Sequence, residues 1–307
     1  MKAVMYHYVR DYDASLPNFR FLNIDSFRKQ LDYFEHNFGF VDFDEWDAFT
    51  TSGTIPHKKG KVLLTFDDAM RCHFDYVYPE LLRRGLWGIF YIPVKPYTMN
   101  QLLDVHKIHL LCGAFDGQIL LDELVSMISE GMVPDKIQKT FKATYLRQEN
   151  QAGVSEFKRV LNYYIDYRYR EPIIDSLANK LQFNFSPSDF YISEENIQTM
   201  DEGGMVIGSH TLSHPVMSKL GRSEQLDEIK ASFQFLENLG VIQSRTYCHP
   251  YGGFHTFNHD TISLLQTENV HYSFNVEARE IESNDFFKSM HYLPRFDCNL
   301  FKHGKAS

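Results

Sequence analysis

The sequence predicts a parallel α/β fold of the size of a single β/α barrel. Short β-rich runs alternate along the chain with segments of helical spacing, which is typical of parallel β/α units. The length of 307 residues lies within the range of one barrel domain. Hydrophobic residues form 43% of the chain and aromatic residues 15%, which is enough apolar surface for a large core.

Six β-rich runs are predicted strands, and four segments are predicted helices. The strands are Ala3–Val9, Lys61–Phe66, Gly88–Val94, Met205–Ser209, Arg245–Cys248 and His271–Asn275. The helices are residues 24–38, 72–84, 222–239 and 258–268, each with apolar residues on one stripe. Gly85 and Gly240 stand where helices commonly end.

The pattern changes between about residues 98 and 196, where helix-like segments follow one another without a clear strand. They are residues 102–111, 120–128, 154–169 and 171–181. We interpret this region as a helical insertion into a single domain that spans residues 1–307.

Composition also excludes some classes of partner. With 40 acidic and 31 basic side chains, the formal charge of −9 repels polyanions, so nucleic acid is not an expected partner. No stretch approaches the roughly 20 apolar residues of a membrane-spanning helix, and the first residues show no leader pattern. We therefore expect a cytosolic protein, unless a leader has been removed. The oligomeric state is not predicted.

Two adjacent carboxylates, Asp67 and Asp68, follow the apolar run Val62–Leu64 in the motif Thr65-Phe66-Asp67-Asp68. Charges at the end of a buried strand are costly unless something compensates them. A metal ion is one compensator. The alternative is that the pair caps the next helix at its N-terminus.

Two histidines, His210 and His214, follow the predicted strand Met205–Ser209. A helical turn after His210 would place both rings on one face, within reach of one ion. Two buried histidines with ordinary hydrogen bonds are the alternative. The end of a strand favours a functional role, because barrel active sites are built there. One carboxylate and two imidazoles suit catalytic zinc and other divalent ions.

A third motif, Tyr247-Cys248-His249-Pro250-Tyr251-Gly252-Gly253, ends the predicted strand Arg245–Cys248. Its composition predicts a tight turn whose backbone N–H groups can point at an anion. Alone it is only a turn. Together with the other two motifs it is a candidate oxyanion hole.

The three motifs resemble, in order, those of the polysaccharide deacetylases with a NodB homology domain. The resemblance covers roughly residues 1–95 and 200–297 and leaves the helical insertion outside. It implies a distorted (β/α) barrel of the polysaccharide deacetylase type. It also implies a metal-dependent hydrolase that removes an acyl group, expected to be acetyl, from the nitrogen of an amino sugar in a glycan or glycan precursor.

The resemblance assigns roles residue by residue. Asp67 corresponds to the catalytic base, while Asp68, His210 and His214 correspond to the metal ligands. Tyr251 would contribute its backbone N–H to the oxyanion hole. Zinc is the expected metal, although nickel, cobalt or iron would fit similar ligands.

The sequence departs from the family pattern at Cys248, where many members place an arginine that orients the base. Other members carry a later Leu-Pro-Arg element, which Leu293-Pro294-Arg295 resembles. We therefore expect Arg295 to pair with Asp67; the alternative is a surface ion pair. Ala69, where a glycine commonly follows the two aspartates, is a milder change.

A general acid is also needed, because the departing amine must be protonated. In one branch of the family this histidine lies in the first strand, in a sequence that Val4-Met5-Tyr6-His7 resembles. His7 is therefore the expected acid, and His291 the second candidate.

Other functions remain open at this point. The chain could hydrolyse a non-sugar amide or an O-acyl ester on the same fold, or it could be a catalytically silent carbohydrate-binding protein. Cys248 is the main argument for a silent protein, while the retained Asp67, Asp68, His210 and His214 argue against one.

Overall fold

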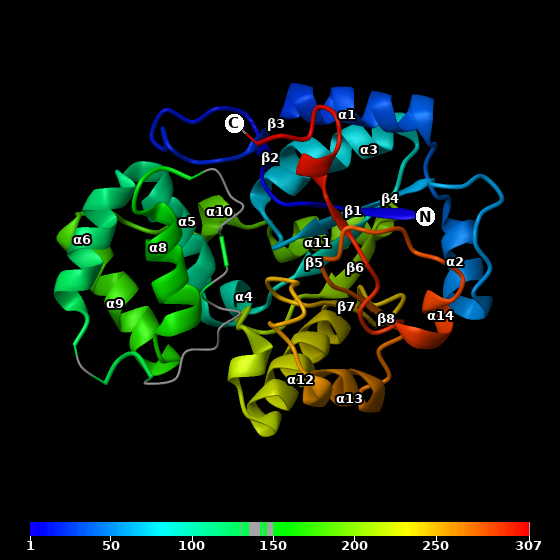
Figure 1. Cartoon of the computed structure of the whole chain (residues 1–307). Coiled ribbons are helices and arrows are strands. Elements are labelled where there is room, and N and C mark those ends of the chain that lie inside the picture. Colours follow the sequence, from blue (N-terminus) through cyan, green and yellow to red (C-terminus); the bar gives the residue numbers. More distant parts are fainter. Residues whose placement is uncertain (130, 135–141, 143, 146–149, 307) are drawn as a thin grey trace. The chain divides into compact units, whose positions relative to one another are not determined.

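The computed structural model describes residues 1–129, 131–134, 142, 144–145 and 150–306 (Figure 1). They form two compact units. The α/β unit contains Met1–Asp11, Phe21–Asn100 and Ser188–Ser307, and the helical unit contains Tyr12–Arg20 and Gln101–Pro187. That the chain forms a single domain stays a prediction.

The α/β unit is built on a curled, seven-stranded parallel sheet with the strand order β8-β7-β6-β5-β4-β1-β9. The strands are β1 (Lys2–Tyr6), β4 (Val62–Asp67), β5 (Ile89–Ile92), β6 (Val206–Ser209), β7 (Thr246–Cys248), β8 (Tyr272–Phe274) and β9 (Phe296–Asp297). A separate parallel pair consists of β2 (Val9–Arg10) and β3 (Leu22–Asn23). The predicted α/β barrel fold class is confirmed.

One C-terminal segment connects the two edges of the curled sheet. Leu293 forms a parallel bridge to Phe274 of β8. Three residues later, Phe296 pairs with Val4 of β1. Arg295 lies between these two pairings, so the closure of the sheet delivers its side chain to the interior.

Helices cover the outside of the sheet in the α/β unit. They are α1 (Ile24–Asn37), α2 (Phe43–Ser52), α3 (Tyr78–Arg84), α4 (Lys95–Met99), α11 (Glu194–Glu202), α12 (Arg222–Leu239), α13 (His259–Thr267) and α14 (Asp285–Lys288). A π-helical turn, His73–Val77, precedes α3, and the 3₁₀ turns are Met217–Lys219 and Cys298–Leu300. The glycines Gly85 and Gly240 end α3 and α12 in the left-handed conformation, as the sequence predicts.

The interior of the curled sheet has an apolar layer and a polar layer. Leu63, Ile89 and Val206 belong to a buried cluster with Trp46 of α2. Side chains alternate along a strand, so Thr65 and Asp67 of β4 follow Leu63 on the same face. The polar layer therefore lies at the carboxyl ends of the strands, and the apolar layer lies next to it on the amino-terminal side. Burial of each large apolar side chain contributes roughly 1.5–3 kcal/mol to stability.

Gly208 of β6 makes room for an aromatic ring within this interior. A Cβ atom there would lie 2.6 Å from Tyr91 of β5 and 2.7 Å from Thr246 of β7. The Tyr91 hydroxyl is hydrogen-bonded to Thr246 Oγ1 at 2.9 Å. A side chain at position 208 would therefore displace Tyr91 from beneath the polar layer.

The helical unit has its own apolar core. It contains α5 (Asp104–Ala114), α6 (Gly117–Met127), α8 (Val154–Arg159), a π-helical turn (Val160–Tyr164) and α9 (Tyr167–Lys180). Ile108, Leu120, Phe157 and Leu177 are fully buried in one cluster. The short α10 (Pro187–Phe190) lies where the sequence returns to the α/β unit. None of the described helices is both long and apolar enough to span a membrane.

Candidate active site

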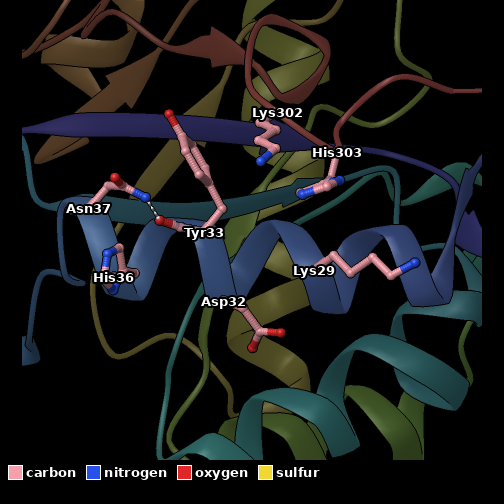
Figure 2. Close-up of a pocket in the computed structure, with 7 residues that line it drawn as sticks. All are labelled: Lys29, Asp32, Tyr33, His36, Asn37, Lys302 and His303. Carbon is pink, nitrogen blue, oxygen red and sulfur yellow. Dashed lines mark hydrogen bonds between the residues drawn. The ribbon is translucent and has the colours of Figure 1, made fainter.

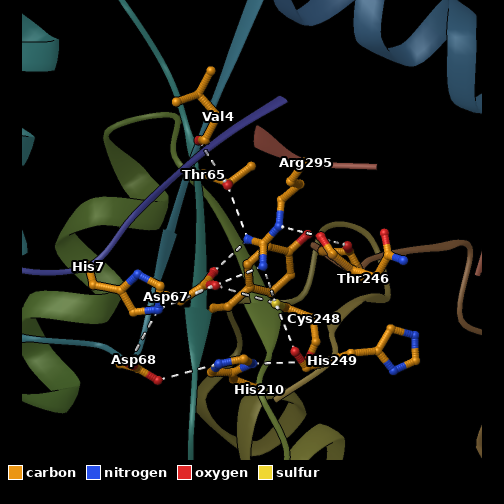
Figure 3. A network of polar contacts seen from close by, with 12 residues as sticks. Val4, His7, Thr65, Asp67, Asp68, His210, Thr246, Cys248, His249 and Arg295 are labelled. Carbon is orange, nitrogen blue, oxygen red and sulfur yellow. Dashed lines mark hydrogen bonds and ion pairs between the residues drawn. The ribbon is translucent and has the colours of Figure 1, made fainter. Parts of the chain in front are cut away.

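Two buried carboxylates stand at the carboxyl end of β4. Asp67 is the last residue of the strand and is 2% exposed, and Asp68 is 3% exposed. The backbone of Asp68 has a φ of 82°, so the chain turns sharply away from the sheet after Asp67. The two neighbouring side chains consequently meet different partners (Figure 3).

Asp67 forms a bidentate ion pair with Arg295. Arg295 Nη1 donates to Asp67 Oδ1 at 2.8 Å, and Nη2 donates to Oδ2 at 2.8 Å. Burial raises the pKa of Asp67, but the charge and hydrogen bonds of Arg295 outweigh this effect and hold the pKa below its usual value. The predicted pairing is therefore present in the structure, and Arg295 is 1% exposed rather than on the surface.

Three further groups fix the Arg295 guanidinium. Nη1 donates to Thr65 Oγ1 at 3.1 Å, Nε donates to the Asn275 carbonyl at 3.1 Å, and Nη2 lies 2.9 Å from Cys248 Sγ. Thr65 and Asn275 were not among the predicted site residues. Only Thr65 could have been found from the sequence, because it stands two positions before Asp67 and therefore lies on the same face of the strand.

Asp68 faces the two predicted imidazoles. Asp68 Oδ1 lies 3.3 Å from His210 Nε2 and 3.5 Å from His214 Nε2, and both histidines are buried. Ligands about 2.1 Å from a shared tetrahedral ion lie about 3.4 Å apart. The spacing and the donor types therefore fit a divalent metal ion.

A second donor group, Asp67, His210 and Cys248, is similarly compact. Both oxygens of Asp67 already accept hydrogen bonds from Arg295, whose cation lies in the same space. The Cys248 thiol is also buried, and burial raises its pKa, which disfavours the thiolate that binds metal. The Asp68 group is therefore the better candidate for a metal site.

His210 is oriented by its second ring nitrogen. Its Nδ1 lies 2.9 Å from the carbonyl oxygen of Cys248 and donates to it when Nε2 faces a metal. Figure 3 shows the ring between Asp68 and the end of β7. The structure therefore connects the second and third sequence motifs through this hydrogen bond.

The two candidate acids lie in different surroundings. His7 Nε2 is 3.8 Å from Asp68 Oδ2 and 4.0 Å from Asp67 Oδ2, and 38% of its side chain is exposed. The carbonyl oxygen of His291 accepts a hydrogen bond from His249 Nε2 at 2.8 Å. The geometry favours His7, because its ring borders both carboxylates and remains accessible.

Tyr251 lies beside the imidazole of His214. Its backbone has a φ of 62°, within the turn predicted from the Pro-Tyr-Gly-Gly sequence. Its ring centroid is 4.9 Å from that of His214. Its role as an oxyanion donor stays a prediction.

A surface hollow of about 350 Å³ lies elsewhere on the α/β unit (Figure 2). It is formed by one face of α1 and the segment after Cys298–Leu300, and its lining residues are Lys29, Asp32, Tyr33, His36, Asn37, Lys302 and His303. None of the predicted site residues belongs to this lining, so the hollow is not the candidate active site.

Fold and site together define an α/β barrel protein with a buried Asp-His-His group at the carboxyl ends of its strands. The polysaccharide deacetylase family model matches residues 173–273, about a third of the 307 residues. This part includes His210, His214 and Tyr251. The predicted resemblance to polysaccharide deacetylases is confirmed, and the predicted enzyme class, a hydrolase of non-peptide carbon–nitrogen bonds, is that of this family.

Solved structures of deacetylases share the fold. The deacetylase PplD from Streptococcus pyogenes, in complex with acetate, is 15% identical, with a TM-score of 0.58 over 97% of this chain and 91% of that chain. IcaB from Ammonifex degensii is 15% identical, with a TM-score of 0.55 over 96% and 90%. The deacetylase domain of BpsB from Bordetella bronchiseptica is 12% identical, with a TM-score of 0.50 over 96% of each chain. No curated protein matches the sequence.

Proposed function

We propose that this protein is a metal-dependent deacetylase that hydrolyses the N-acetyl amide of an amino sugar in a glycan or glycan precursor. The observation that carries the proposal is the arrangement of the two neighbouring carboxylates. Asp67 is held ionised by Arg295, and Asp68 is grouped with His210 and His214. A metal-dependent hydrolase requires a base beside its metal ion, whereas a binding protein does not.

Asp68, His210 and His214 would hold the ion, with zinc as the expected metal. A bound divalent ion supplies Lewis-acid activation of water and of the substrate carbonyl. Asp67 accepts the proton of the attacking water, and Arg295 keeps its carboxylate ionised and pointed at the site. The water oxygen bonds to the acyl carbon, and the carbon–nitrogen bond then breaks.

The remaining proposed roles concern the oxyanion and the departing amine. The backbone N–H of Tyr251 donates a hydrogen bond to the developing oxyanion. The protonated ring of His7 gives its proton to the leaving nitrogen, from a position within 4.0 Å of both carboxylates. The products are an amino sugar and acetate.

The proposal is tested by acetate release from N-acetylglucosamine oligomers and from a nucleotide-linked N-acetyl sugar. The protein is first stripped with a chelator and then reloaded with zinc, nickel, cobalt or ferrous iron. We expect no activity when it is stripped, near one metal ion per chain after reloading, and recovery of acetate release. Absence of metal after reloading would overturn the proposal.

The same assay separates the alternative functions. Hydrolysis of an O-acetyl sugar or a cyclic amide, without release from N-acetyl sugars, would move the activity to another acyl substrate. Sugar binding without any product, measured by calorimetry on the metal-loaded protein, would identify a silent carbohydrate-binding protein.

A further inference from the structure

The loop that carries both histidines, defined here as residues 209–214 and beginning with the last residue of β6, has an unusual backbone. Thr211 has a φ of 68° and His214 a φ of 56°, and neither is a glycine. Left-handed conformations are unfavourable for residues with a Cβ atom, and they persist only where surrounding contacts enforce them. The direction of the His214 ring is therefore set by contacts of the loop.

Some of these contacts lie within the loop. The Thr211 N–H donates to Ser209 Oγ at 3.3 Å, and the His214 N–H donates to Thr211 Oγ1 at 2.9 Å. They fix the local turn. They do not by themselves fix the position of the turn relative to the sheet and Asp68.

Helix α12 holds the loop at two points. Ser209 Oγ is hydrogen-bonded to Ser232 Oγ at 2.6 Å. The Glu228 carboxylate accepts a hydrogen bond from the Ser213 N–H at 2.8 Å and another from Ser213 Oγ at 2.5 Å. Residues 228 and 232 are four positions apart, so they lie on one face of the helix.

Glu228 is the charged member of this pair. Burial raises its pKa, and hydrogen bonds from Ser213, from the Leu212 backbone and from the Thr211 side chain oppose this effect without cancelling it. All of these donors belong to the histidine loop, so the carboxylate from α12 is satisfied by this loop. A neutral residue would be the simpler choice if α12 only had to pack against the sheet.

We infer that Glu228 is a positioning residue for the metal site, because it clamps Ser213 and so holds the left-handed backbone at His214 that aims the ring at Asp68. This inference rests on the proposed metal site and adds a residue outside the three sequence motifs. Loss of a group that orients the ligands of a metal typically weakens metal affinity by about 10- to 100-fold.

The test measures zinc affinity by competition with a chromophoric chelator in four proteins: wild type, Glu228→Ala, Glu228→Gln and Asp227→Ala. Asp227 is the matched control, since it is an exposed carboxylate on the same helix. We expect about 10- to 100-fold weaker binding for Glu228→Ala. Glu228→Gln should fall between this variant and wild type, because one oxygen can still accept from the Ser213 N–H. Asp227→Ala should bind as wild type does.

A second readout reports geometry rather than affinity. The visible absorption spectrum of the cobalt-loaded protein depends on the arrangement of the ligands, so it should change in Glu228→Ala and not in Asp227→Ala. Wild-type affinity together with a wild-type cobalt spectrum in Glu228→Ala would overturn the inference.

Two controls keep the test decisive. If Glu228→Ala does not fold, as judged by circular dichroism, Ser213→Ala decides instead, since it removes the hydroxyl that donates to Glu228 and should weaken zinc binding measurably. Unchanged affinity there would overturn the inference. A wild-type protein that binds none of zinc, nickel, cobalt and ferrous iron defeats the proposed metal site itself. A protein that binds zinc but releases no acetate defeats the proposed activity and leaves the role of Glu228 intact.

Discussion

The surroundings of Asp67 differ from those of Asp68, although the two residues are neighbours in the sequence. Asp67 faces the buried guanidinium of Arg295, which donates two hydrogen bonds to its carboxylate. Asp68 faces two imidazoles through one oxygen, at 3.3 Å and 3.5 Å. The charge of Asp67 is thus balanced by a permanent protein cation, whereas Asp68 and the two imidazoles have the spacing of ligands that share one added ion.

The difference shows how one strand end can supply two chemical roles. Residues on a strand alternate between its faces, and the positive φ of Asp68 separates the two side chains further. A carboxylate paired with arginine stays ionised and oriented, as a base must. A carboxylate beside two histidines offers the mixed donors that zinc prefers.

The largest effect is expected from exchanging each carboxylate for its amide. Asp67→Asn should lower kcat by about 10²- to 10⁴-fold, because the proposed base is lost, while zinc binding stays near one ion per chain. Asp68→Asn should lose both activity and metal. Elemental analysis beside acetate release checks both variants. Equal loss of metal in both variants would contradict the proposal that Asp68 is a metal ligand and Asp67 is not.

The next effect concerns the buried ion pair. Arg295→Met should destabilise the fold by about 3–5 kcal/mol, because it leaves the Asp67 charge buried without its partner. Arg279 offers a matched control, since it also forms two 2.8 Å hydrogen bonds to one carboxylate, that of Asp285, but is 38% exposed. Arg279→Met should cost less, because the buried Asp285 carboxylate keeps hydrogen bonds from the Glu282 N–H and from Ser289 Oγ. Urea unfolding of both variants at pH 7 tests this, and equal losses would contradict it.

A smaller, pH-dependent effect is expected at His249, beside Cys248. Its ring is 1% exposed, and burial lowers its pKa to about 3. The unfolded chain therefore takes up a proton first as the pH falls below about 6.5, and stability falls by about 1.4 kcal/mol per pH unit from there toward pH 3.

His249→Gln removes this proton uptake and retains a side-chain N–H that can donate to the His291 carbonyl. Its unfolding free energy should fall less between pH 7 and pH 4.5 than that of wild type, by roughly 3 kcal/mol. Urea unfolding at the two pH values gives the comparison. Parallel losses in the two proteins would show that His249 does not titrate in this way.

The smallest effect is expected at Cys248. Its thiol lies 2.9 Å from Arg295 Nη2 and 3.5 Å from Asp67 Oδ2, and Arg295 supplies the cation expected at this position in many relatives. Cys248→Ser keeps a donor and an acceptor there, so kcat/KM should change by less than about tenfold, which corresponds to 1.4 kcal/mol. A larger loss in steady-state kinetics would mean that the thiol itself takes part in orienting Asp67.

Much of the fold was predictable from local patterns. Six predicted strands correspond to β1, β4, β5, β6, β7 and β8, because each is a compact β-rich run between turn residues. The first was predicted too long: after Tyr6 the chain leaves the sheet, and Val9–Arg10 pairs with Leu22–Asn23 instead. The two-residue strand β9 is too short to produce a periodic pattern, and it was missed.

The three motifs and the positions of Asp67, Asp68, His210 and His214 at strand ends were determined by the sequence alone, because local composition fixes where strands stop and turns begin. Tertiary structure decided the partners. The Arg295–Asp67 pair joins residues 228 positions apart and forms because the segment Leu293–Asp297 closes the sheet. Glu228 reaches Ser213 because α12 packs beside β6. Such contacts depend on how strands curl and helices pack, which no local pattern encodes.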